Sequence, residues 1–155
     1  MNTLTWQWAA FDELDGPTVH AIMAARQQVF VLEQQCLYPD IDGLDPRAYH
    51  LLGWQVGDGE RKLTAYLRCF APRAKDAYQN DVVLGRVLTV QAVRGTGLGR
   101  QLMTEGMRRV EQHFPGCRVR ISAQQHLQRF YDDFGFVAVS DGYMEDGIPH
   151  VDMHR

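Results

Sequence analysis

A glycine-rich turn past the middle of the chain is the segment whose residue types and spacing could best do chemistry. Residues 94–99 read Arg-Gly-Thr-Gly-Leu-Gly. Glycines let the backbone approach a ligand closely, and the first turn of a helix presents unpaired N–H groups at its positive dipole end. If a helix begins at this turn, the segment is an anion site, best suited to a phosphate or pyrophosphate group.

The order of residues in this turn excludes two common phosphate-binding motifs. A P-loop ends in Gly-Lys-Ser/Thr, whereas this turn ends in Gly-Leu-Gly. A Rossmann fingerprint has the spacing G-x-G-x-x-G early in its fold, whereas this turn reads G-x-G-x-G. Taken alone, residues 94–99 are also compatible with a plain loop that binds nothing.

The flanks of the turn predict a strand before it and a helix after it. Residues 82–90 are rich in β-branched and aliphatic side chains and contain no proline. Apolar side chains recur at helical spacing over residues 98–114. Pro115 and Gly116 end this helix, and residues 117–122 predict the next strand, so the unit should be a right-handed parallel crossover.

The rest of the chain predicts further strands and two further helices. In chain order these are a strand at 4–11, a helix at 17–30, strands at 49–56 and 62–70, a helix at 125–134, and strands at 136–139 and 150–154. An irregular stretch begins at Val31; its aspartates lack the order of an EF-hand, so it is interpreted as a solvated loop. The fold class is α/β: one domain over residues 1–155, with a mixed sheet and helices on both faces.

Length and composition fit an ordinary globular domain. The 155 residues carry a formal net charge of −3, so no basic surface predicts a nucleic-acid partner. We expect no membrane partner and no signal peptide, because no apolar run reaches about 18 residues. Cys36, Cys69 and Cys117 have unrelated spacings and predict reduced thiols in a cytoplasmic protein, with Cys117 in the core. His150 and His154 share a strand face but lack a third ligand, so no metal is expected.

Several segments together resemble the GNAT acyltransferase superfamily. Residues 94–99 match its pyrophosphate loop, Arg/Gln-x-x-Gly-x-Gly/Ala. Residues 123–136 are similar to its N-x-x-A-x-x-x-Y-x-x-x-G-F segment, with Tyr131 in the tyrosine place. Residues 26–51 and 145–150 resemble one branch, the ElaA-like acetyltransferases. The resemblance therefore extends over nearly the whole chain.

The resemblance implies a fold whose central parallel strands splay apart to hold acetyl-CoA as co-substrate. The central strand would pair with the pantetheine arm, and the main-chain N–H groups of the loop would wrap the pyrophosphate. Gln124 stands where the superfamily usually has an asparagine. The implied cofactor-binding residues are Val87, Leu88, Thr89, Arg94, Gly95, Thr96, Gly97, Leu98, Gly99, Arg100 and Gln124.

The implied reaction is direct transfer of the acetyl group to a primary amine through a tetrahedral intermediate. Tyr131 would be the general acid for the departing thiolate, because a phenol with a pKa of about 10 stays protonated at neutral pH; a purely structural tyrosine is the alternative. A free backbone N–H near Leu88 would stabilise the oxyanion. His50, Glu33, Glu145 or a chain of waters would supply the base, and the sequence does not choose among them.

The identity of the acceptor leaves three interpretations open. We expect a small-molecule amine, with a peptide or protein amine and a non-catalytic acetyl-CoA sensor as the alternatives. An acidic cluster suits any cationic amine and does not separate these interpretations. Its members are Asp40, Asp42, Asp45, Glu145 and Asp146. A homodimer is left open.

Overall fold

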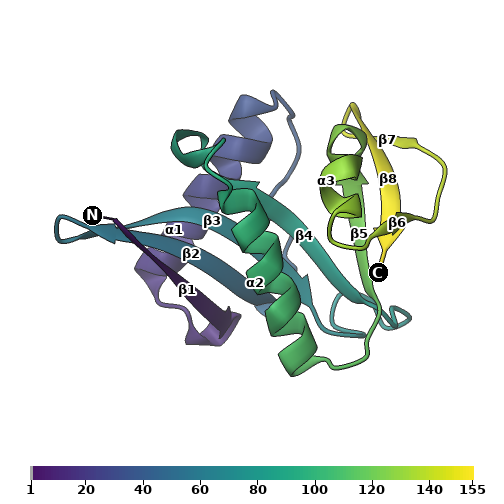
Figure 1. The fold of residues 1–155 in the computed structure, drawn as a ribbon, viewed down its shortest axis with the longest axis horizontal. Coiled ribbons are helices and arrows are strands. Elements are labelled where there is room, and N and C mark those ends of the chain that lie inside the picture. Colours follow the sequence, from purple (N-terminus) through teal and green to yellow (C-terminus); the bar gives the residue numbers. More distant parts are fainter. Residues whose placement is uncertain (1) are drawn as a thin grey trace.

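The fold is built around a mixed β-sheet (Figure 1). The computed structural model describes residues 2–155. Over these residues the sheet has eight strands in the order β1-β2-β3-β4-β5-β8-β6, with β7 paired to β8. The strands are β1 (Thr3–Ala10), β2 (Tyr49–Gly57), β3 (Glu60–Phe70), β4 (Val82–Thr89), β5 (Val119–Gln124), β6 (Val137–Ala138), β7 (Tyr143–Glu145) and β8 (Ile148–His154). Of the described pairs only β4 and β5 run parallel, which confirms the expected mixed sheet.

The α-helices are α1 (Gly16–Arg26), α2 (Leu98–His113) and α3 (Gln128–Asp132). In Figure 1, α1 lies on one face of the sheet and α2 on the other. Residues of α2 and α3 belong to one buried cluster, while Ile22 of α1 belongs to a second cluster with Leu52 and Tyr66. Helices therefore cover both faces, as expected.

Two features of these helices go beyond the sequence pattern. The expected helix at 17–30 ends as an α-helix at Arg26 and continues as a π-helix, Gln27–Glu33. Gly106 allows α2 to lie close to the sheet, because a Cβ there would be 2.8 Å from Cδ2 of Leu67.

Among residues 2–155, no helix combines the length and apolar character that a membrane span needs.

One turn closes the β2–β3 hairpin, and another holds Cys117. Asp58 and Gly59 both have positive φ, 52° and 77°, and close the β2–β3 hairpin. The expectation of a core position for Cys117 was wrong. Cys117 lies in the turn that follows α2, is exposed, and precedes the first paired residue of β5, Val119.

The parallel strands β4 and β5 pair at one end and then diverge. Their pairing covers Val82–Leu84 and Val119–Ile121. Beyond this point β4 continues with a partner only on β3, and its register there is broken by a bulge at Arg86, whose φ is 52°. Figure 1 shows the two strands separating above the paired end. The expected splay of the central parallel strands is thus confirmed.

Candidate functional site

A cavity of about 420 Å³ opens where β4 and β5 separate. Backbone and side chains of β4 form one wall, and β5 with α3 forms the opposite wall. The segment between the π-helix and β2 and the turn between β7 and β8 close the sides. Lining residues include Tyr38, Asp42, Gly85, Val87, Gln124, Tyr131, Glu145 and His150. Segments far apart in the sequence thus meet around one hollow.

The glycine-rich turn lies between the end of β4 and the first turn of α2. A short 3₁₀-helix, Gln91–Val93, leads into it. Gly95 and Gly97 have φ of 80° and 86°, and a Cβ at either position would meet nothing within 4 Å. Gly97 is the N-cap of α2, with no side-chain hydrogen bond to the helix. The first N–H groups of α2 are therefore without a capping side chain, which is the arrangement that suits an anion.

The N–H groups of β4 that face the gap belong to the residues on either side of Leu88, the expected oxyanion donor. The N–H of Val90 donates to the carbonyl oxygen of Thr64 on β3 at 3.0 Å, and Leu88 pairs with Tyr66. Because N–H groups alternate sides along a strand, the N–H of Leu88 also points to β3. The N–H groups that face the gap after the bulge are those of Val87 and Thr89.

Tyr131 reaches the cavity from α3, on the side opposite β4. Its ring packs edge-to-face with Phe130, at 5.2 Å between centroids, and with Phe136, at 6.0 Å. Burial raises the pKa of Tyr131 to about 12. The phenol is therefore fixed in position by aromatic packing and protonated throughout the physiological pH range.

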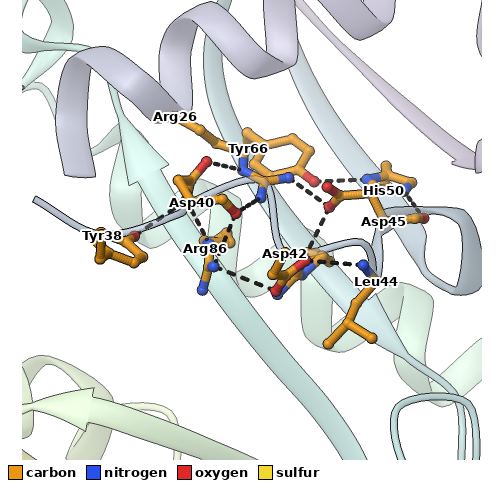
Figure 2. Close-up of polar contacts among 10 residues, drawn as sticks. Arg26, Tyr38, Asp40, Asp42, Leu44, Asp45, His50, Tyr66 and Arg86 are labelled. Atoms are coloured by element: carbon orange, nitrogen blue, oxygen red, sulfur yellow. Dashed lines mark hydrogen bonds and ion pairs between the residues drawn. The ribbon is translucent and has the colours of Figure 1, made fainter. Parts of the chain in front are cut away.

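Three arginines and three aspartates form an ion-pair network beside the cavity (Figure 2). The arginines come from α1, β3 and β4, and the aspartates come from the segment before β2. The members are Arg26, Arg68, Arg86, Asp40, Asp42 and Asp45. Arg26 is fully buried; its Nε lies 2.9 Å from Asp40, and its Nη1 lies 2.5 Å from Asp45.

This network corrects two expectations from the sequence. The segment is not a solvated loop, since Asp40 and Asp45 are only 7% and 3% exposed. Nor are the three aspartates a free acidic cluster, because three arginines balance their charge. A buried guanidinium requires carboxylate partners, and these partners draw the segment against the sheet. The available signal was Arg26, which lies on the apolar face of the expected helix.

His50 lies outside the cavity, and both of its ring nitrogens are already hydrogen-bonded. The carbonyl oxygen of Asp45, 3.0 Å from Nε2, can only accept, so Nε2 carries the proton. Nδ1, at 2.6 Å, then accepts from the hydroxyl of Tyr66. His50 is fully buried, and burial lowers its pKa. His50 therefore has no free lone pair with which to take a proton from the amine substrate.

The cavity also has residues that sequence reasoning did not place there. Cys36 donates from Sγ to the carbonyl oxygen of Asp146 at 3.1 Å and so joins the segment before β2 to the β7–β8 turn. His150 lines the cavity, although the sequence suggested for it only a metal site that lacked a third ligand. The strand β7 was not expected, because three residues are too few for a periodic pattern. Within residues 2–155, no group of three or more His, Cys, Asp or Glu side chains is arranged to hold a metal ion.

Known proteins similar to this chain agree on one family. A family model described as an acetyltransferase (GNAT) domain matches residues 74–155, more than half of the chain. Protein ElaA of Escherichia coli is 40% identical over 154 residues, which cover 98% of this chain and 96% of that protein. A UPF0039 protein of Synechocystis is 39% identical over 150 residues, covering 97% and 94%.

Solved structures extend the agreement to the fold. An acyl-CoA N-acyltransferase from Pseudomonas aeruginosa superposes with a TM-score of 0.90 at 41% identity, and Escherichia coli ElaA with 0.88 at 39%; both alignments cover 99% of each chain. An aminoglycoside 6'-N-acetyltransferase complexed with coenzyme A shares the fold, with a TM-score of 0.67, at 11% identity over 96% of each chain. The chain belongs to the GNAT family of acyl-CoA-dependent acyltransferases, in its ElaA-like branch.

Proposed function

We propose that the protein is an N-acetyltransferase that transfers the acetyl group of acetyl-CoA to the primary amine of a small molecule. The observation that carries this proposal is the hollow between β4 and β5. It brings an exposed strand edge and a protonated phenol to the same space, and the glycine-rich anion site follows at the end of β4.

Acetyl-CoA would lie along the open edge of β4, with its pyrophosphate at the first turn of α2. The gap-facing backbone of Val87 and Thr89 would pair with the pantetheine arm as a neighbouring strand would. The main-chain N–H groups of the loop would wrap the pyrophosphate. The loop residues that we assign to this contact are Arg94, Gly95, Thr96, Gly97, Leu98, Gly99 and Arg100. Gln124, at the end of β5, would contact the cofactor from the other side of the gap.

The chemistry follows from these positions. Attack of a neutral amine on the thioester carbon places negative charge on the carbonyl oxygen, and the gap-facing N–H of Val87 would stabilise it. This assignment replaces the N–H of Leu88, which points to β3. The thiolate that then departs would take the phenolic proton of Tyr131. The raised pKa keeps this proton in place until charge develops on the sulfur.

The size and closure of the cavity favour a small acceptor over a protein. A volume of about 420 Å³ is that of a small-molecule site. The contact between Cys36 and Asp146 closes one side, so the hollow is not an open groove for an extended peptide.

The free thiols of the three cysteines fit a reducing compartment such as the cytoplasm.

Release of free CoA from acetyl-CoA tests the proposal, with a panel of primary amines and lysine-containing peptides as acceptors. We expect turnover with one or more small amines and much lower kcat/KM with peptides. Turnover that is faster with peptides would assign the protein to the peptide acetyltransferases. Tight acetyl-CoA binding without turnover on any acceptor would make it a sensor, and no binding would remove the proposal.

A further inference from the structure

His150 lies on β8, opposite Gln124 of β5, and lines the same cavity as Tyr131. It is only 8% exposed. Its ring stacks on that of Tyr143, with centroids 6.0 Å apart and an interplanar angle of 21°. The imidazole is thus held in one orientation at the wall formed by β5 and β8.

The hydrogen bonds of the ring determine which nitrogen is free. Nδ1 of His150 lies 2.7 Å from the carbonyl oxygen of Ile148. A carbonyl oxygen only accepts, so Nδ1 carries the proton and donates it. In the neutral imidazole the lone pair is therefore on Nε2, which is the nitrogen that a general base uses.

A carboxylate lies beside this lone pair. Oε2 of Glu145 is 3.5 Å from Nε2 of His150. When the imidazole is neutral, both atoms are acceptors, and two facing acceptors repel each other unless a donor lies between them. An alkylammonium group is such a donor, because it has three N–H bonds and a positive charge. When the imidazole takes a proton, the same carboxylate stabilises the cation.

We infer that His150 is the general base of the reaction and that Glu145 positions the acceptor ammonium and stabilises the imidazolium. This inference rests on the proposed function. Nε2 of His150 takes one proton from the ammonium, and the lone pair that is freed forms the C–N bond. The C–S bond breaks, the thiolate takes the proton of Tyr131, and the second amine proton restores the phenol. In total one proton passes from His150 to water.

Two of the other candidate bases, Glu33 and His50, are engaged elsewhere. Glu33 pairs with Arg94 at 2.8 Å. Both nitrogens of His50 are hydrogen-bonded. Tyr143 of β7 stacks on the ring of His150. The other titratable and charged groups that line the same cavity come from β3, β4, β7, α3, the β7–β8 turn and the segments before β2 and β4. They are Cys36, Tyr38, Asp42, Arg68, Lys75, Arg86, Tyr131, Glu145 and Asp146. The carboxylate at 3.5 Å is the group that favours the imidazolium.

The test is the pH dependence of kcat/KM for His150→Gln, with His154→Gln as matched control. His154 lies on the same strand and outside the cavity lining. The acceptor is the amine with the highest turnover in the panel. Wild type should show a plateau at neutral pH that extends up to the pKa of the amine, because the enzyme itself deprotonates the ammonium form that predominates there. The variant should lose about 10²–10⁴-fold at pH 7 and rise tenfold per pH unit, because only the rare neutral amine can react.

Two further measurements separate this inference from the proposed function. The affinity of His150→Gln for acetyl-CoA should stay within a few-fold of the wild-type value. An unchanged pH profile of kcat/KM in this variant would overturn the inference and leave the acetyltransferase assignment intact. Nitrogen-15 spectra of the side chain should show neutral His150 with its proton on Nδ1. A proton on Nε2, or an equal loss of activity in His154→Gln, would also overturn it. Failure of the wild-type chain to bind acetyl-CoA would overturn the proposed function itself.

Discussion

Arg94 of the glycine-rich turn pairs with Glu33 at the end of the π-helix, with 2.8 Å between Nη2 and Oε2. The same guanidinium donates from Nε and Nη2 to the carbonyl oxygen of Thr89, at 3.1 and 2.9 Å. That carbonyl faces the gap beside β4. Arg94 therefore covers the strand edge that we assign to the pantetheine arm, and under this assignment a bound cofactor would displace it.

Glu33→Gln should consequently tighten acetyl-CoA binding. Removing the carboxylate leaves only the hydrogen bonds to Thr89 to hold Arg94 away from the pyrophosphate. An exposed ion pair is worth about 0.2–1 kcal/mol, so the gain should be about 1.4- to five-fold in Kd, measured by calorimetry. Acetyl-pantetheine, which has no pyrophosphate, should gain less. Unchanged or weaker binding of acetyl-CoA would mean that the pair does not compete with the cofactor.

Gly97→Asp should abolish CoA binding, because a carboxylate would occupy the place of the pyrophosphate at the start of α2. Gly59→Asp is the matched control. Both glycines have positive φ, 86° and 77°, and open space at the Cβ position, but Gly59 lies in the β2–β3 hairpin. Calorimetry should show normal affinity for the control alone. Normal affinity in a folded Gly97→Asp chain would remove the anion site from the loop.

Tyr131→Phe keeps the ring and its packing and removes only the hydroxyl. If that hydroxyl protonates the thiolate, kcat should fall by about 10²–10⁴ while acetyl-CoA affinity stays within a few-fold. Tyr49→Phe, on β2 and outside the cavity lining, should leave kcat unchanged. A loss of less than about tenfold in Tyr131→Phe would transfer the acid role to water or another group.

Arg26→Met should destabilise the fold strongly. Its side chain is fully buried, and its removal leaves Asp40 and Asp45 with fewer counter-charges. Breaking a buried pair typically costs about 3–5 kcal/mol in the free energy of unfolding, which urea denaturation measures. Arg108→Met, which removes an exposed pair with Glu105, should leave stability nearly unchanged. Equal changes in the free energy of unfolding of the two variants would show that the network does not stabilise the fold.

Acid should weaken the same network through Asp42. Burial opposes ionisation of this carboxylate, but hydrogen bonds from Arg68 and from the N–H of Leu44 outweigh it and hold its pKa well below the usual range. Its stabilising contribution is therefore present above about pH 4, the unfolded value, and is lost as the pH falls toward the lower folded pKa. Below about pH 4, the free energy of unfolding should decline less steeply in Asp42→Asn than in wild type. Parallel pH profiles would contradict the assignment.

The sequence predicted the elements whose pattern is local. The strand and helix around residues 94–99 and the mixed sheet follow from periodicity and from breaker residues a few positions apart. The ion pairs of Arg26 were not predicted, because they join residues 14 and 19 positions apart that only the fold brings together. The interpretation of residues 31 onward as a solvated loop failed for this reason.

The sequence placed some residues of the candidate site near one another, but it did not predict which N–H groups of β4 face the gap. The glycines and Tyr131 stand in recognisable motifs, so their neighbourhood could be anticipated. The expected N–H donor at Leu88 is displaced by a bulge at Arg86, a residue type that gives no sign of a positive φ. The placement of His150 depends on the short pairing between β7 and β8, which no periodic pattern indicates.

The segment beside the cavity contains both buried anchor residues and exposed residues, and this difference is useful for protein engineering. Asp40 and Asp45 are held by buried arginines and lie outside the cavity lining, so changes there should cost folding stability. Leu37 and Ile41, in the same segment, are 96% and 66% exposed. Libraries that vary these two exposed positions can change the surface next to the cavity-lining Tyr38 and Asp42 while the network keeps the segment in place.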